Sequence, residues 1–324
     1  MAGISVAILL LLTLAMYHQT MSYLTGLWSE MEIGEYGHGY LILAISGYLM
    51  LRNRRLLSAM TACPYPPALL AVLAAGLLWA VAVLVDVLVL QTVGLLLLIV
   101  AIVWTVFGNQ ITAKLLLPIL FIGFAIPIWF PLSPILQELS ADVVFGLIRI
   151  LGVPAFRQVN EIVLPAGTLS VTEACSGLRY LIPAVALCLL YGYLNYDSFR
   201  SRLIVVIISA AAAVLVNIIR VFVVFYLVYT TEMQHPFVED HLVLGWYLFA
   251  GMVFILLVID ALLHRRYLPS GPDDAVGSHR SLSASCDMGN LHRVVILLAG
   301  AVLLSVGPAA AYWVNHQPAF GKGQ

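Results

Sequence analysis

The sequence predicts an all-α integral membrane protein, a multi-pass helical bundle of about eight or nine transmembrane helices, with a small amphipathic helix and a β-hairpin inserted on the outer side. Hydrophobic residues make up 62% of the 324, and the mean hydropathy is +1.03. Charged residues make up 10%, where a soluble domain has about 25%. So few charges cannot cover the surface of a soluble protein, and four cysteines exclude a disulfide-rich scaffold.

Apolar runs of near-helical length without charged residues mark the candidate spans. The first run has no basic segment before it and no small-residue cleavage site after it, so we expect a retained span rather than a signal peptide. The second run is the shortest. The nine predicted spans cover residues 4–27, 38–51, 67–85, 88–107, 114–130, 176–194, 203–229, 241–263 and 294–314.

The distribution of charge predicts the orientation. With nine spans, the cations that lie between spans fall mainly on one side, which the positive-inside rule assigns to the cytoplasm; they include Arg52, Arg200, Arg202 and Arg265. Most acidic residues fall on the opposite side. The amino terminus is therefore predicted inside and the carboxyl terminus outside.

The outer segment between the fifth and sixth spans is long enough to carry structure of its own. Residues 136–151 have apolar side chains at helical spacing, which favours a helix on the membrane surface. Residues 158–163 and 168–172 flank a Leu-Pro-Ala-Gly turn and predict a small hairpin. The predicted face of the surface helix comprises Ile135, Leu139, Val143, Gly146 and Ile150.

The chain is predicted to divide into three parts. Residues 1–265 form the main transmembrane domain, with a core at 35–260. Residues 266–293, rich in Gly, Ser and Asp, form a cytoplasmic linker, and residues 294–324 form an extra transmembrane helix with a short outer tail.

Arg220 is the clearest polar residue inside a predicted span. A charged side chain within the bilayer costs about 2.5–3.5 kcal/mol even on the lenient insertion scale, so it needs a reason. Asn217 precedes Arg220 by three residues and shares its helix face. The alternative is an arginine that snorkels or pairs structurally with an acid of another helix.

Cys175 lies just before the sixth predicted span, in the run Glu173-Ala174-Cys175-Ser176-Gly177-Leu178-Arg179. Helix amino termini stabilise anions and activate thiols, and Arg179 adds positive potential on the same face. Packing of a small buried residue is the equally weighted alternative for an isolated cysteine. The spacing of Cys and His residues predicts no metal site and no cofactor.

Two histidines lie on the outer side. His241 begins the eighth predicted span, where a helix-entry residue at the polar interface is the plain alternative. His38, in Gly37-His38-Gly39-Tyr40, is a fainter candidate. Because Cys175, Arg220 and His241 belong to three consecutive spans and share one depth, they suffice for acyl transfer: a thiolate attacks a carbonyl, His moves protons, and Arg stabilises the oxyanion.

These motifs resemble those of the exosortases, multi-pass membrane transpeptidases of Gram-negative bacteria. The matching segments are 173–179, Asn217-Ile218-Ile219-Arg220, and His241 with Gly245-Trp246, supported by 37–40, Ile126-Pro127-Ile128-Trp129 and Leu164-Pro165-Ala166-Gly167. The resemblance covers about residues 35–260.

The resemblance implies a cysteine peptidase or transpeptidase of the inner membrane that cuts PEP-CTERM-type sorting signals at the periplasmic face and is linked to exopolysaccharide production. Such signals carry a Pro-Glu-Pro motif, a transmembrane helix and an Arg-rich cytoplasmic tail. Cys175 would be the nucleophile, Arg220 the transition-state stabiliser and His241 the general acid/base. The supporting residues would be Arg179, Asn217, Glu173 and His38. The implied partners are the substrate proteins, an unknown acyl acceptor and membrane lipid, without nucleic acid.

Two other functions remain open from the residues alone. A transporter or exopolysaccharide-export component would use Arg220 and Asn217 to bind an anionic substrate, although no paired inverted segments are found. A membrane acyltransferase with a catalytic His would need a second polar cluster on the cytoplasmic side, and the sequence offers no strong one.

Overall fold

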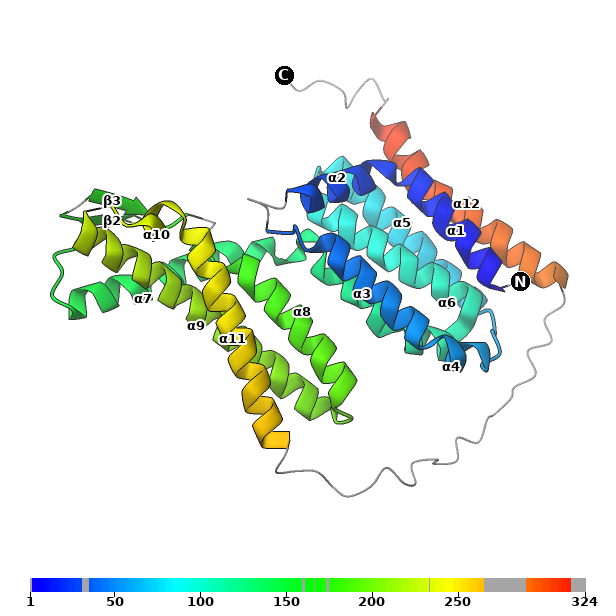
Figure 1. The fold of residues 1–324 in the computed structure, drawn as a ribbon. Helices are drawn as coiled ribbons and strands as arrows, with labels where there is room; N and C mark the ends of the chain where they lie inside the picture. Colours follow the sequence, from blue (N-terminus) through cyan, green and yellow to red (C-terminus); the bar gives the residue numbers. More distant parts are fainter. Residues whose placement is uncertain are drawn as a thin grey trace. The chain divides into compact units, whose positions relative to one another are not determined.

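A computed structural model of the chain describes residues 2–30, 35–158, 161–165, 167–172, 175–232, 234–264 and 290–315. The described part is mostly helical and has one small β-sheet (Figure 1). The chain forms two compact units, the first from Met1–Ile128 and His279–Gln324 and the second from Trp129–Ser278. Residues 266–289 of the predicted linker 266–293, the tail from residue 316 and Glu173 lie outside the described residues, and residues 290–293 of that linker belong to a helix, α12.

The first unit is a set of packed helices. α5 packs against both α6 and α12, and α1 contacts α6 and α12. Tyr17, which is fully buried between α1 and α2, donates a hydrogen bond to the carbonyl of Leu304 on α12 over 3.1 Å. The elements are α1 Ala2–Met16, α2 His18–Ser29, α3 Gly39–Arg52, α4 Arg54–Ser58, η1 Pro66–Ala68, α5 Leu69–Leu84, α6 Leu88–Phe121, η2 Ile122–Phe124 and α12 Asn290–Asn315.

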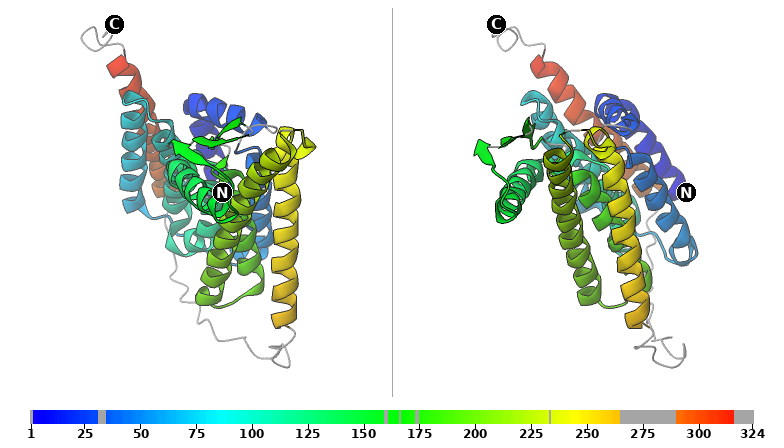
Figure 2. Two further views of the ribbon diagram at one scale, coloured as in Figure 1. Left: turned by 90° about the vertical axis from the view of Figure 1, so that its left-hand side faces the viewer. Right: turned by 60° about the vertical axis from the view of Figure 1, so that its left-hand side comes forward.

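The second unit is organised around α9, which packs against α7, α8, α10 and α11. Its elements, after η3 Pro127–Leu132 at the junction of the units, are α7 Ser133–Ile150, β1 Phe156–Gln158, β2 Glu161–Leu164, β3 Gly167–Ser170, α8 Leu178–Asn195, α9 Phe199–Thr231, α10 Pro236–Glu239 and α11 His241–His264. The strands and α10 lie at the end of the unit where α11 begins, as the views in Figure 2 show.

The described helices include fewer long spans than the eight or nine predicted. Six are long and apolar enough to cross a membrane, or seven if α1 and α2 form one bent span. The predicted span 4–27 corresponds to two helices, α1 and α2, which meet at an angle of 81° and form one span only as a bent pair. α3 has 14 residues, about 21 Å of helix, which is shorter than the ~30 Å hydrocarbon core.

The fourth predicted span and residues 114–124 of the fifth lie in one stretch, Leu88–Phe124, which counts once among the six. Residues 127–130 of the fifth predicted span belong to η3. Gly108 interrupts the helical backbone of Leu88–Phe124, with φ 76° and ψ −175°. Residues 88–107 therefore form a separate helix as predicted, and the second helix follows directly after Gly108 rather than at residue 114. The predicted end of the fourth span at residue 107 coincides with this break, where Gly108-Asn109-Gln110 interrupts the apolar run.

The amphipathic helix predicted between the fifth and sixth spans is α7. Its predicted face is exposed, with Ile135 at 63% and Ile150 at 82%. The opposite side packs into the unit through Ala141, Val144 and Ile148. An exposed apolar face on a helix whose other side is buried fits a helix lying on a membrane surface.

The predicted hairpin is a three-stranded antiparallel sheet with the order β1-β2-β3. The predicted first strand 158–163 was wrong in its bounds, because residue 158 ends β1 and β2 begins at Glu161. In β2 the side chains of Ile162 and Leu164 are buried, and they share one hydrophobic cluster with Val221 and Phe225 of α9. Three-residue strands carry too little alternation to be separated from a turn by pattern alone.

The topology can be tested on α8, which joins Cys175 to the loop at Asp197 through a single span. We expect a membrane-impermeant maleimide to label Cys175 from the periplasm in a variant whose other cysteines are replaced. A cysteine introduced by Asp197→Cys in a cysteine-free background should react only after the inner membrane is opened. Labelling of both positions from the same side would contradict the span.

Candidate functional site

The segment before α8 holds Cys175 in a tight turn. The backbone N–H of Cys175 donates to the carbonyl of Thr172 over 2.8 Å, and the Thr172 hydroxyl lies 3.9 Å from Sγ. Gly177 follows in the left-handed conformation, with φ 83°, and α8 begins at the next residue. The half-buried, unpaired thiol of Cys175 therefore lies just before the amino terminus of α8.

Asn217 ties this turn to α9. Its Nδ2 donates to the carbonyl of Cys175 over 2.8 Å and to the hydroxyl of Ser140 on α7 over 3.1 Å. Asn217 is 2% exposed, and its Oδ1 is buried without a hydrogen-bond partner among the described residues. One amide thus links three elements of the unit and leaves a buried acceptor beside the cysteine turn.

Gly177 allows the cysteine turn to pack closely against Asn217. A Cβ added to Gly177 would lie 2.5 Å from Cγ of Asn217, closer than any side chain tolerates. The positive φ also favours glycine at this position. Gly177 thus lets the cysteine turn approach α9 closely enough for the Asn217 hydrogen bond.

Arg220 lies one turn beyond Asn217 on α9 and is 1% exposed. Its Nη1 donates to the hydroxyl of Tyr180 on α8 over 3.0 Å, and its Cζ lies 5.1 Å from the centroid of the same ring. A guanidinium over an aromatic face gains electrostatic stabilisation that grows when both groups are desolvated. Tyr180 therefore contacts the buried cation with both its ring and its hydroxyl.

Gly245 lets α11 approach this pair. A Cβ at Gly245 would lie 1.8 Å from the hydroxyl oxygen of Tyr180 and 3.0 Å from Cδ of Arg220. Trp246 and Phe249 of α11 have ring centroids about 6 Å from that of Tyr180. Tyr180 and Arg220 thus occupy the space between α8, α9 and α11 that the missing side chain leaves.

His241, the first residue of α11, lies near the same charge. Its half-buried imidazole makes a hydrogen bond to the backbone of Val238 and is within electrostatic range of the guanidinium groups of Arg220 and Arg179. The carboxylate of Asp240 accepts a hydrogen bond from the backbone N–H of Val243 over 3.2 Å, which caps α11. The cap fixes the start of the helix and with it the backbone of His241.

The second unit therefore brings together five residues predicted from the sequence: Cys175, Asn217, Arg220, Arg179 and His241. His38 belongs to the first unit, where its Nε2 lies 3.0 Å from the carbonyl oxygen of Phe124. Burial lowers the pKa of the His38 imidazole, and this hydrogen bond opposes the shift. Its role stays a prediction. The described residues include no group of three or more His, Cys, Asp or Glu side chains arranged to hold a metal ion.

Three contacts of this site were not predicted. Tyr180, Ser140 and the close approach at Gly245 depend on which faces of separate helices meet, and sequence spacing gives depth only. A signal for Tyr180 was present in principle, because its hydroxyl belongs to an apolar span close to Cys175 and would need a partner there.

Replacing Gly245 with Ala tests the packing. We expect Gly245→Ala to lower stability by about 1–3 kcal/mol, the usual cost of overpacking, because the new methyl group overlaps the Tyr180 hydroxyl. The midpoint of thermal denaturation in detergent measures the loss. Gly251→Ala is the matched control on the same helix, since a Cβ there has nothing within 4 Å. Equal midpoints for the two variants would contradict the close approach.

A comparison with protein-family models matches residues 28–258 to the family of transmembrane exosortases. Comparisons with curated proteins and with solved structures found no match. The matched range includes the cysteine turn, Asn217, Arg220 and the start of α11. The matched range ends before α12. It is close to residues 35–260, over which the sequence motifs resemble the family. Exosortases process PEP-CTERM proteins, which implies a sorting peptidase or transpeptidase. Because the match covers well over half of the chain, the protein is a member of the transmembrane exosortase family.

Proposed function

We propose that this exosortase is a membrane-embedded cysteine transpeptidase or protease that cleaves C-terminal PEP-CTERM-type sorting signals at the periplasmic face of the inner membrane. Cys175 acts as the nucleophile, Arg220 stabilises the transition state and His241 is the general acid and base. Arg179, Asn217, Glu173 and His38 are assigned supporting roles. The link to exopolysaccharide production belongs to the same proposal.

The observation that carries the proposal is the connection from Cys175 to His241 through one helix. Asn217 holds the carbonyl of Cys175, and Arg220 one turn later acts electrostatically on His241. A nucleophile, a fixed cation and an imidazole are thereby gathered in one unit. These are the three groups that acyl transfer needs.

The chemistry proceeds in two steps. The Cys175 thiolate attacks the carbonyl carbon of the scissile peptide bond, and the carbonyl oxygen becomes an oxyanion. When the C–N bond breaks, His241 in its protonated form gives a proton to the leaving amine, and a thioester remains on Sγ. An acceptor amine or water, deprotonated by the now neutral His241, then attacks the thioester and releases the Cys175 thiolate, which leaves the imidazole protonated for the next cycle.

Arg220 suits the oxyanion role because its position is fixed before the substrate arrives. Tyr180 holds the guanidinium by a hydrogen bond and by its ring, so little reorganisation is needed during the reaction. In this proposal the buried Oδ1 of Asn217 accepts a hydrogen bond from a backbone N–H of the bound peptide, which satisfies the acceptor left open in the described residues.

Replacing the nucleophile gives the primary test. We expect Cys175→Ala and Cys175→Ser to abolish processing of a co-expressed PEP-CTERM protein, measured by its shift on a gel, while the enzyme accumulates normally in the membrane. Cys188→Ala is the control for loss of a thiol, because Cys188 lies in the middle of α8. Processing at the normal rate by Cys175→Ala would rule out thiol catalysis. Transport of an anionic substrate would instead depend on Arg220 and be indifferent to Cys175.

The shape of the cation is a second test. We expect Arg220→Lys to lose most of the activity, about 100-fold in kcat, because an ammonium cannot reproduce the planar fork of donors or the contact with the Tyr180 ring. Arg200→Lys is the matched control, an exposed arginine near the start of the same helix. Single-turnover cleavage of a sorting-signal peptide measures the effect. Equal rates for Arg220→Lys and the wild type would argue against a role for the planar guanidinium in the reaction.

A further inference from the structure

Two polar side chains of α7 lie on the side of the helix that packs into the second unit, and the proposed reaction gives them no role. Gln137 and Ser140 are three residues apart, so they share one face of the helix. Ser140 is 1% exposed and Gln137 is half-buried. Burying a polar group costs free energy unless it finds a hydrogen-bond partner, and both side chains find one at or beside the cysteine turn.

Gln137 holds the beginning of the cysteine turn. Its Nε2 donates a hydrogen bond to the backbone carbonyl of Val171, a fully buried residue of the hydrophobic cluster under the sheet. The next residue is Thr172, whose carbonyl accepts the hydrogen bond from the backbone N–H of Cys175 over 2.8 Å. Gln137 therefore fixes the residue from which the turn to Cys175 starts.

Ser140 acts at the other end of the turn, through Asn217. The Nδ2 of Asn217 donates to Oγ of Ser140 over 3.1 Å and to the carbonyl of Cys175 over 2.8 Å. A backbone carbonyl only accepts hydrogen bonds, so the amide nitrogen of Asn217, and not its oxygen, faces Cys175. Ser140 thus holds the amide in the orientation in which it can bind the Cys175 carbonyl.

The turn from Thr172 to Cys175 is therefore held at both ends by hydrogen bonds that trace back to one helix. Neither bond uses Sγ of Cys175, so both restrain the backbone and leave the thiol available for reaction. A shift of about 1 Å in a reacting group can cost about 100-fold in rate. Restraints of this kind on the backbone of a nucleophile therefore affect the chemical step.

We propose that Gln137 and Ser140 are positioning residues, which hold Cys175 where it can attack the substrate through the Val171 carbonyl and the Asn217 amide. Neither residue touches the substrate or takes part in the bond changes. The inference rests on the proposed function, because it assumes that Cys175 is the nucleophile. The restraint itself can be measured on the thiol without any substrate.

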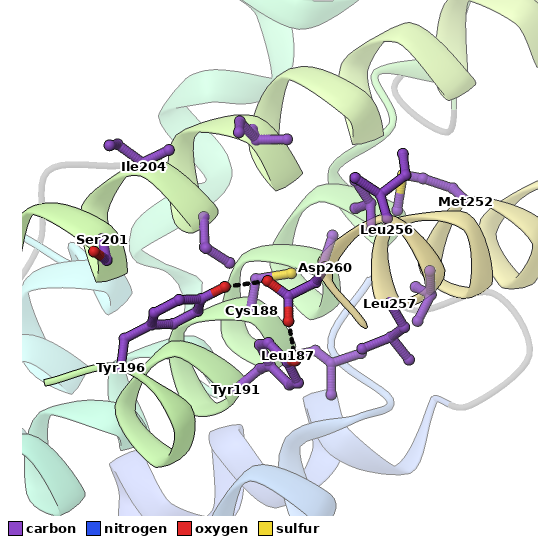
Figure 3. A pocket seen from close by; sticks show the side chains of 15 residues that line it. Leu187, Cys188, Tyr191, Tyr196, Ser201, Ile204, Met252, Leu256, Leu257 and Asp260 are labelled. Atoms are coloured by element: carbon purple, nitrogen blue, oxygen red, sulfur yellow. Dashed lines mark hydrogen bonds between the residues drawn. The ribbon is translucent and has the colours of Figure 1, made fainter. Parts of the chain in front are cut away.

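Cys188 is an internal reference for such a measurement. It lies on α8, in the wall of a cavity of about 720 Å³ between α8, α9 and α11 (Figure 3). Among the described residues that line this cavity, none belongs to α7. At one end of the cavity the hydroxyls of Tyr191 and Tyr196 donate to the carboxylate of Asp260, contacts that changes in α7 leave intact.

Replacing Ser140 with Ala removes the acceptor that orients the Asn217 amide. We expect kcat for cleavage of a sorting-signal peptide to fall about tenfold with little change in KM, because a displaced nucleophile slows the chemical step. In the substrate-free enzyme, N-ethylmaleimide should modify Cys175 several-fold faster and Cys188 at the wild-type rate, measured by peptide mapping. Gln137→Met, which keeps the length but loses the donor, should give the same pattern. Glu138→Gln, an exposed neighbour on α7, is the matched control and should match the wild type.

A double-mutant cycle separates positioning from packing. If Ser140 acts through Asn217, Ser140→Ala should cause no further increase in the rate of Cys175 modification in an Asn217→Ala enzyme. Additive effects, faster modification of Cys188 together with Cys175, or wild-type cleavage and modification rates for either Ser140→Ala or Gln137→Met would overturn the proposal. Cleavage by Cys175→Ala would instead refute the proposed function, which the modification rates do not depend on.

Discussion

Arg220 places a full positive charge on the longest apolar helix of the second unit, and the surrounding helices are arranged to accommodate it. Tyr180 of α8 meets the guanidinium with its hydroxyl and its ring, and Gly245 of α11 leaves the space in which both side chains lie. Without these contacts the buried cation would cost about 2.5–3.5 kcal/mol or more. The packing of α8 and α11 against α9 therefore depends on the contact between Arg220 and Tyr180. The same packing places His241 within electrostatic range of the Arg220 guanidinium.

The cysteine turn is also held against α9, through a hydrophobic cluster and one hydrogen bond. α7 and the small sheet pack against the end of α9 through a hydrophobic cluster that includes Val144, Ile162 and Phe225, and Cys175 contacts this cluster. Asn217 then fixes the carbonyl of Cys175 below it. This packed segment thus supports the cysteine turn, and the opposite apolar face of α7 is exposed, as expected for a helix on a membrane surface. In this arrangement α9 supports both Cys175, the proposed nucleophile, and Arg220.

Hydropathy and helical rise predict a depth for each polar group. Cys175, Arg220 and His241 were chosen that way, and the second unit gathers them. The contacts between helix faces could not be predicted from the sequence. Tyr180 and Ser140 were not predicted, because two helices of given depth can pack against each other in many rotations about their axes. The bend between α1 and α2 was not predicted, because residues 4–27 were predicted as one span, whereas the break at Gly108 coincides with the predicted end of the fourth span.

In the proposed reaction an acyl group is carried on Cys175 between cleavage and transfer. Rapid acid quench of the full-length enzyme with a sorting-signal peptide, followed by intact-mass analysis and peptide mapping, tests it directly. We expect a mass increase equal to the amino-terminal cleavage fragment less one water, located on the peptide that contains Cys175 and removed by hydroxylamine. Cleavage of the peptide at the normal rate with the adduct on Cys188, or with no adduct under conditions that accumulate product, would contradict the account.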